Sequence, residues 1–192
     1  MQRLVFDPIQ STLITLASEQ VPDAVSILDV GCGTGRLLRT ASQRFPGARL
    51  EGIDAAAHMV EQAVRLLPPG APIHFQQANA EALPFGDGQF DLVFSTMTFH
   101  HWADQKKGVS EVARVLAPGG RWLLADYIGQ GLVRTVTQLF RLHRFFDRKG
   151  LDSFIADAGL VVVVERPSRW LGKSVPVLAI KKMERAMGIE PT

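Results

Sequence analysis

Three glycines at alternate positions, Gly31, Gly33 and Gly35, follow the apolar, β-branched stretch VSILDV at residues 25–30. A glycine-rich loop after a strand lets the backbone approach a ligand, which can be a phosphate, a dinucleotide or a nucleoside. The carboxylate of Asp29 precedes this loop. It repels a pyrophosphate and suits a ligand that carries an ammonium or sulfonium charge. An ordinary tight turn, which also uses glycine, is the alternative interpretation.

The residues after the third glycine argue against two of these ligands. A Walker A loop ends in Lys-Ser or Lys-Thr, whereas Gly35 is followed here by Arg36 and Leu37. The dinucleotide fingerprint needs a small residue at its sixth position so that the helix and strand can pack closely. Arg36 occupies that position, which disfavours a nicotinamide-dependent oxidoreductase.

Further polar residues follow the ends of predicted strands. Asp54 ends the second one; its carboxylate can accept hydrogen bonds from ribose hydroxyls or cap the next helix, and the two roles are compatible. Asn79 and Glu81 come just after the third predicted strand. His100 and His101 come after the fourth. Histidine suits proton transfer because its unperturbed pKa is about 6.5, and the alternative is a structural role for both rings.

Strand-like and helix-like segments alternate along most of the chain. Apolar, β-branched stretches predict strands at 25–30, 48–53, 72–77, 91–96, 121–126, 160–165 and 175–182. Helical spacing of apolar residues predicts helices at 8–19, 36–45, 58–67, 105–116, 131–149 and 151–159. The sequence APGG at 117–120 ends one helix and turns the chain into the next strand. This alternation predicts a parallel sheet covered by helices on both faces.

Bulk composition is that of a globular protein. The 192 residues are 46% hydrophobic and 21% charged, and the net charge of +2 does not demand a polyanionic partner. A single cysteine, Cys32, excludes a disulfide framework and a multi-cysteine metal site. No apolar run approaches the ~20 residues of a membrane span, and no secretory signal is recognised, so we expect a cytoplasmic protein. One domain is predicted over 1–182, and the tail at 183–192 is interpreted as disordered or foreign to the fold.

Five stretches, in this order, resemble the class I S-adenosylmethionine-dependent methyltransferases: LDVGCGTG, GIDAAAHMV, NAEALPFGDGQFDLVFS, HHW and RVLAPGG. The small-molecule branch that includes the ubiquinone and menaquinone biosynthesis enzymes is the most similar. The resemblance is strong over about residues 25–126 and general elsewhere. It implies an α/β, Rossmann-like three-layer sandwich whose seven-stranded, mostly parallel sheet has the order 3-2-1-4-5-7-6, with the last strand antiparallel.

The same resemblance implies that S-adenosylmethionine lies across the carboxyl ends of strands one, two and four. Asp29 and the glycine loop would face its methionine part, Asp54 its ribose and Met59 its adenine face. Asn79 stands where the family usually has Asp beside the adenine amine, and an amide can both accept from and donate to adenine. The implied cofactor-binding residues are Asp29, Gly31, Cys32, Gly33, Gly35, Asp54, Ala55, Met59, Asn79, Ala80, Glu81 and Ser95. No metal is expected.

The implied reaction is an in-line displacement on a sulfonium carbon, which needs a base only when the nucleophile must lose a proton. By resemblance, His101 is favoured over His100 as that base. The segment 95–102 lacks the Asp/Asn-Pro-Pro-aromatic motif of nucleic-acid base methyltransferases and the paired glutamates of protein arginine methyltransferases. A single cysteine also excludes the multi-cysteine arsenic scheme. We therefore expect a small-molecule acceptor and no nucleic acid.

The basic, aromatic segment 132–150 lies between the fifth and sixth strands, where this family places a substrate lid. It fits an ordinary covering helix, an apolar or acidic substrate, or contact with an anionic membrane surface. A monomer and a homodimer both stay open. The alternative to an enzyme is a non-catalytic module that binds a cofactor or a partner. In the segment 132–150, the candidates to line an apolar pocket are Leu132, Val136, Leu139, Phe140 and Phe146. Its positive charges are Arg134, Arg141, Arg144 and Arg148.

Overall fold

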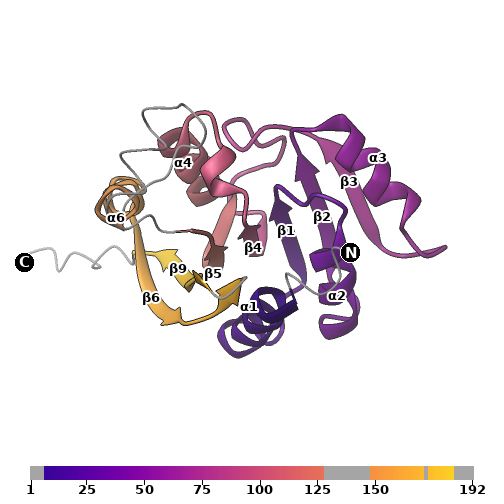
Figure 1. Ribbon diagram of the computed structural model, residues 1–192, viewed down its shortest axis with the longest axis horizontal. Coiled ribbons are helices and arrows are strands. Elements are labelled where there is room, and N and C mark those ends of the chain that lie inside the picture. The colour runs from indigo at the N-terminus through magenta and orange to yellow at the C-terminus, as the bar shows by residue number, and fades with distance from the viewer. Residues whose placement is uncertain (1–6, 128–147, 171–172, 184–192) are drawn as a thin grey trace, which may run out of the picture.

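The computed structural model describes residues 7–127, 148–170 and 173–183, which fold into a central sheet with helices on both sides (Figure 1). Seven strands pair in the order β3-β2-β1-β4-β5-β9-β6. Strand β9 runs antiparallel to both of its neighbours, while β1 to β5 are parallel. The predicted α/β fold and its strand order are confirmed, with β9 as the seventh strand. The bounds are β1 (Ser26–Val30), β2 (Arg49–Asp54), β3 (Ile73–Gln77), β4 (Phe90–Thr96), β5 (Leu116–Ala125), β6 (Leu160–Arg166) and β9 (Val177–Lys182).

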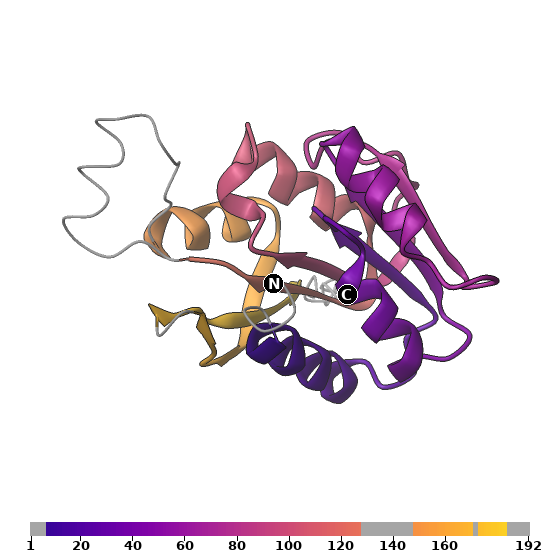
Figure 2. The ribbon, with the colours of Figure 1, turned by 45° about the vertical axis from the view of Figure 1, so that its right-hand side comes forward.

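The described helices form the two outer layers of the sandwich. They are α1 (Asp7–Gln20), α2 (Arg36–Arg44), α3 (Ala57–Arg65), α4 (Gln105–Val115) and α6 (Arg148–Asp157). Helices α1 and α2 pack on one face of the sheet, and α4 and α6 pack on the opposite face (Figure 2). Within the described ranges, no helix is both long enough and apolar enough to cross a membrane.

Apolar periodicity places the helices on the sheet. Ile9, Leu13 and Leu16 recur along α1 and are fully buried, as their spacing predicts. Each such side chain contributes about 1.5–3 kcal/mol when it leaves water. On the opposite face, Val109 and Val112 of α4 are also fully buried. The two helical layers therefore hold the sheet rigidly and leave the carboxyl ends of its strands open for a site.

Strand β5 begins at Leu116, earlier than the predicted 121–126, because Leu116 already pairs with Phe90 of β4. The APGG residues lie between that pair and the next one, Arg121 with Leu92, as an irregularity within the strand. Its pairing shifts register between Phe90 and Leu92 of β4. Gly120 allows this close approach, since a Cβ there would lie 2.9 Å from the carbonyl oxygen of Asp91. The glycines and the proline of APGG therefore lie in an irregular part of β5 rather than in a separate turn.

Two further differences concern the C-terminal third. The predicted boundary between a helix at 131–149 and another at 151–159 is wrong, because α6 runs through Gly150 from Arg148. Tertiary packing of Leu151 and Ile155 overrides the low helix propensity of that glycine. A two-stranded hairpin of β7 (Arg169–Trp170) and β8 (Lys173–Ser174) was not predicted, since two residues are too few to show a pattern. The lid residues 132–147 and the tail 184–192 lie outside the described residues.

Candidate functional site

The loop between β1 and α2 is held by backbone hydrogen bonds to the end of β2. Gly31 and Cys32 both donate their N–H groups to the carbonyl oxygen of Ile53, at 2.8 Å each. The three glycines of the loop have positive φ, at 78° for Gly31, 53° for Gly33 and 72° for Gly35. Residues with a Cβ rarely adopt this conformation, so the glycines determine the shape of the loop.

The surroundings of the three glycines differ. A Cβ on Gly31 would lie 2.0 Å from Oγ1 of Thr98, and a Cβ on Gly35 would lie 2.3 Å from the ring of Phe75. A Cβ on Gly33 would have no such neighbour within 4 Å. Gly31 and Gly35 therefore make room for other parts of the protein, whereas Gly33 faces open space.

That open space belongs to a cavity of about 690 Å³ at the carboxyl ends of β1, β2 and β4. This volume is in the usual range for sites that bind small molecules. Residues from four separate loops border it. Those that the sequence singled out are Asp29, Gly31, Cys32, Gly33, Asp54, Ala55, Met59, Asn79, Ala80, Glu81 and His101.

Asp29 is the most unusual charge in this cavity. It is 2% exposed, and burial, together with the nearby charge of Asp54, raises its pKa to about 8. Its Oδ1 atom has no hydrogen-bond partner among the described residues. Buried carboxylate oxygens are normally hydrogen-bonded, so an unpaired one at the wall of a cavity calls for a donor from a ligand.

Asp54 connects two neighbouring loops. Its Oδ2 accepts a hydrogen bond from the N–H of Gly33, and its Oδ1 accepts one from the N–H of Ala56, both at 2.9 Å. The carboxylate thus supports the start of α3, although Ala56 is the N-cap residue itself. A carboxylate has about four acceptor positions, so two remain for hydroxyl groups of a ligand.

Three of the candidate residues lie behind the cavity wall. Gly35 contacts Phe75, as described above. Ser95 is fully buried, and its hydroxyl accepts a hydrogen bond from Nε1 of Trp122 at 3.1 Å. The Nδ1 atom of His100 lies 2.7 Å from Oδ1 of Asp126. These residues support the cavity without bordering it.

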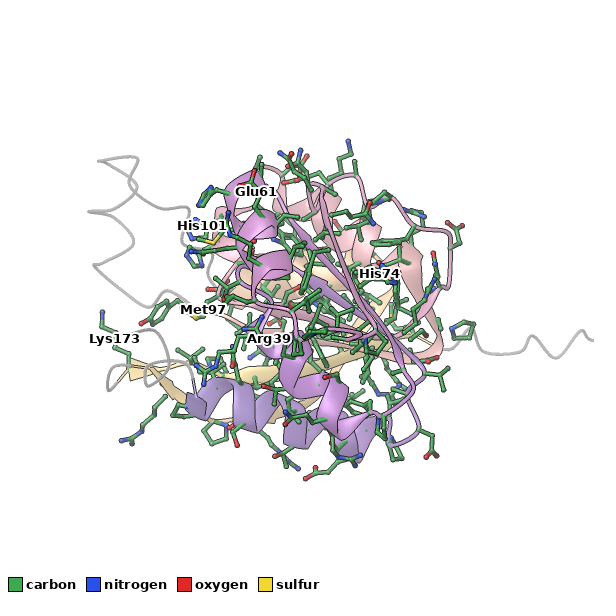
Figure 3. The ribbon with its side chains drawn as sticks, turned by 90° about the vertical axis from the view of Figure 1, so that its right-hand side faces the viewer. Arg39, Glu61, His74, Met97, His101 and Lys173 are labelled. Atoms are coloured by element: carbon green, nitrogen blue, oxygen red, sulfur yellow. The ribbon has the colours of Figure 1, made fainter. Side chains whose placement is uncertain are left out.

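The two histidines occupy a short 3₁₀ turn, Phe99–His101, that follows β4. His101 borders the cavity, and its backbone N–H donates to the carbonyl oxygen of Thr98 at 2.9 Å. Its ring packs on that of His100, with centroids 4.0 Å apart. Figure 3 shows His101 and Met97 at the same edge of the molecule.

Several residues at the cavity were not predicted for it. Met97 has a φ of 54°, which is uncommon for a residue with a side chain and turns the chain sharply after β4. The buried Oγ1 of Thr96 has no hydrogen-bond partner among the described residues. No local pattern identifies such residues, because the cavity is assembled from distant segments. The additional bordering residues include Gln10, Thr34, Arg36, Leu37, Thr96, Met97, Thr98, Trp102 and Ala103.

Residues 27–120 match the family described as a methyltransferase domain. The demethylmenaquinone methyltransferase of Thermus thermophilus is 41% identical over 115 residues, which cover 59% of this chain and 51% of that protein. The malonyl-[acyl-carrier protein] O-methyltransferase of Geobacter sulfurreducens is 32% identical over 164 residues, which cover 79% of this chain and 61% of that protein. The chain therefore spans about half to three fifths of the length of these two curated relatives.

A solved structure supports the same fold. The geranyl diphosphate C-methyltransferase of Streptomyces coelicolor, in complex with Mg²⁺, geranyl diphosphate and S-adenosyl-L-homocysteine, superposes with a TM-score of 0.76 at 19% identity. The match covers 90% of this chain and 77% of that one. Sequence motifs, strand order and the match over residues 27–120 agree: this chain is similar to the class I S-adenosylmethionine-dependent methyltransferases and shares their fold.

Proposed function

We propose that this protein binds S-adenosylmethionine in the 690 Å³ cavity and transfers its methyl group to a small-molecule acceptor. The observation that carries the proposal is the buried, unpaired Oδ1 of Asp29 at the cavity wall, beside the open space at Gly33. The ammonium group of the cofactor's methionine part is a donor of the kind that this oxygen lacks. The methyltransferase names of the relatives support the same assignment.

The other bordering residues fit the rest of the cofactor. Asp54 has acceptor capacity left for ribose hydroxyls after its two backbone hydrogen bonds. The amide of Asn79 matches the donor and acceptor edge of adenine. Met59 supplies a polarizable side chain of the type that packs on aromatic rings. In this proposal Asp29, Asp54, Met59 and Asn79 hold the cofactor.

When bound, the cofactor would supply a methyl group on a sulfonium sulfur: the nucleophile of the acceptor would bond to the methyl carbon in line with the breaking carbon–sulfur bond, and S-adenosylhomocysteine would leave. The protein has to hold the acceptor in the right orientation, which lowers the entropic part of the barrier. His101 at the cavity wall is the group that takes a proton when the acceptor must lose one. Trp102, which is 5% exposed, keeps water from the same side.

The cavity also contains features that suit an acceptor. Leu37, Met97 and Trp102 give its wall an apolar part, and Arg36 gives it a cationic group. An apolar acceptor with an acidic or electron-rich head fits this combination. The quinone and acyl substrates in the names of the two relatives are of that kind.

A thermal-shift titration with S-adenosylmethionine, S-adenosylhomocysteine and NAD tests the cofactor first. A ligand at a hundred times its dissociation constant stabilises the fold by about 2.7 kcal/mol, or roughly 5–10 °C for a domain of this size. We expect the shift with the two adenosyl ligands and none with NAD. Methyl transfer from radiolabelled cofactor to a panel of quinols, fatty acyl carboxylates and phenols then tests catalysis. A shift with NAD alone would exclude the proposed cofactor.

A further inference from the structure

Asp126 follows the end of β5, is 1% exposed, and binds the histidine turn through both of its carboxylate oxygens. Its Oδ1 lies 2.7 Å from Nδ1 of His100, and its Oδ2 accepts the backbone N–H of His100 at 3.2 Å. Oδ1 also accepts the N–H of Tyr127 at 2.6 Å. Burying a carboxylate is costly unless several donors compensate for it. Two of these three donors belong to His100.

The bond to Asp126 favours one tautomer of the His100 ring. A carboxylate at hydrogen-bond distance from Nδ1 requires a proton on that nitrogen. In a neutral ring the proton then sits on Nδ1, and Nε2 carries none. The side chain of His100 is 10% exposed, so the hydrogen bond to Asp126 holds the orientation of the ring.

His100 in turn supports His101. The two ring centroids are 4.0 Å apart, with an angle of 44° between the ring planes. His101 borders the cavity and His100 does not. The order from the interior to the cavity is therefore a buried carboxylate, the imidazole bound to it, and the imidazole that faces the ligand.

We infer that Asp126 and His100 are a positioning pair that holds and electrostatically supports the ring of His101. The inference rests on the proposed function, in which His101 takes a proton from the acceptor. The proton leaves the nucleophilic atom of the acceptor and binds a ring nitrogen of His101, which becomes a cation. The electron-rich face of the His100 ring attracts that cation, and the nearby negative charge of Asp126 stabilises it further.

Nuclear magnetic resonance of ¹⁵N-histidine-labelled protein tests the pair without an acceptor. Long-range ¹H–¹⁵N spectra identify the protonated nitrogen of each ring. The chain has five histidines, and His100→Gln and His101→Gln assign the two signals. We expect His100 to be protonated on Nδ1 alone at slightly alkaline pH. In Asp126→Asn we expect this single form to be lost and the ring signals of His101 to shift.

Asp91→Asn is the matched control. Asp91 is also an acceptor inside the sheet, since its Oδ2 accepts the N–H groups of Val25 and Ser26 at 3.0 Å each. Its replacement should destabilise the fold and leave both histidine signals in place. His100→Phe keeps a flat ring beside His101 and loses the bond to Asp126, so it separates packing from charge if Asp126→Asn folds poorly.

The outcomes separate this inference from the proposed function. If the wild-type protein fails to bind S-adenosylhomocysteine by calorimetry, the proposed function fails, whatever the spectra show. If the ligand binds but His100 carries its proton on Nε2, the positioning pair is overturned. It is equally overturned if Asp126→Asn leaves the His101 signals unchanged. Unchanged ligand affinity in Asp126→Asn, together with shifted His101 signals, supports the inference.

Discussion

The side chain of Thr98 fills the space beside Gly31 that any Cβ at that position would need, at 2.0 Å from its Oγ1. Gly31 belongs to the loop after β1, and Thr98 precedes the histidine turn after β4. The part of the cavity wall proposed for the cofactor and the part that carries His101 are therefore packed directly on each other. A substitution that moves one of these two loops should therefore also shift the position of the other.

Gly31→Ala should destabilise the protein strongly. The new Cβ would meet Thr98, and φ at this position is 78°. Backbone strain and overpacking together cost about 2–5 kcal/mol, which urea denaturation measures. Gly33→Ala is the control, because its φ is positive but its Cβ has no neighbour within 4 Å. It should cost only ~1 kcal/mol of stability and weaken S-adenosylhomocysteine binding. Equal losses of stability in the two variants would contradict this account of the loop.

Asp54→Ala should weaken cofactor binding and loosen the loops. The N–H groups of Gly33 and Ala56 would lose their acceptor. Because both are only partly buried, water can replace part of each bond, and the cost should be about 1 kcal/mol for each donor. Asp54→Asn keeps one oxygen and should fall between Ala and the wild type. Isothermal titration with S-adenosylhomocysteine measures the affinity of all three proteins. An affinity that is the same in all three would remove Asp54 from the site.

The pKa of Asp29, raised from 3.8 to about 8, makes stability depend on pH. Between these values the folded protein holds a proton on Asp29 that the unfolded chain has released. The free energy of unfolding therefore falls as pH rises through this window, by at most about 1.4 kcal/mol per pH unit. Asp29→Asn lacks this contribution, so it should gain stability relative to the wild type as pH rises. Denaturation curves of both proteins at acidic, neutral and alkaline pH check the sign. Parallel pH profiles would argue against a raised pKa.

Asp29 should also couple cofactor binding to proton release. An ammonium group beside the carboxylate favours its ionised form, so binding at neutral pH should expel the proton. Titration calorimetry of S-adenosylhomocysteine in two buffers with different ionisation enthalpies counts that proton. We expect buffer-dependent heats for the wild type and buffer-independent heats for Asp29→Asn. The reverse pattern would place the ammonium group elsewhere.

His101→Ala should reduce methyl transfer by about 10²–10⁴-fold for an acceptor that must lose a proton. Its affinity for S-adenosylhomocysteine should stay close to that of the wild type, because the glycine loop and Asp54 are unchanged. Rates and affinities measured on the same preparations separate the two effects. An acceptor that is already ionised should be methylated at the wild-type rate. Loss of rate with that acceptor as well would assign His101 a structural role.

Cys32 should be chemically inert although it borders the cavity. Burial, with the charges of Asp29 and Asp54, raises the pKa of its thiol well above the usual value, so little thiolate is present. Thiolate is the reactive form of cysteine. Mass spectrometry after incubation with iodoacetamide at pH 8 should show unmodified protein, and denatured protein is the positive control. Rapid modification of the folded protein would show that the thiol is more exposed than described.

Local patterns were sufficient for most of the described fold. The spacing of Ile9, Leu13 and Leu16 predicted an amphipathic helix, and all three are buried in α1. Predictions failed where packing outweighed local preference. Gly150 lies inside α6, and β5 begins at Leu116, before the APGG stretch rather than after it. The secondary structure of such positions depends on tertiary contacts. For α6, these contacts are made by the buried side chains of Leu151 and Ile155.

The sequence by itself predicted the glycine loop, the elements that flank it and the resemblance to a family, because all three depend on residue types at fixed spacings along the chain. The sequence distinguished His101 from His100 only by resemblance, and the tertiary structure supplied the physical difference between them. The two histidines are adjacent in the chain, yet one is bound to Asp126, 26 residues further on, and the other borders the cavity. The difference arises because a buried carboxylate needs hydrogen-bond donors, and these can come from residues that are distant in the sequence. The pairing of β5 with β4 brings Asp126 beside the turn that follows β4.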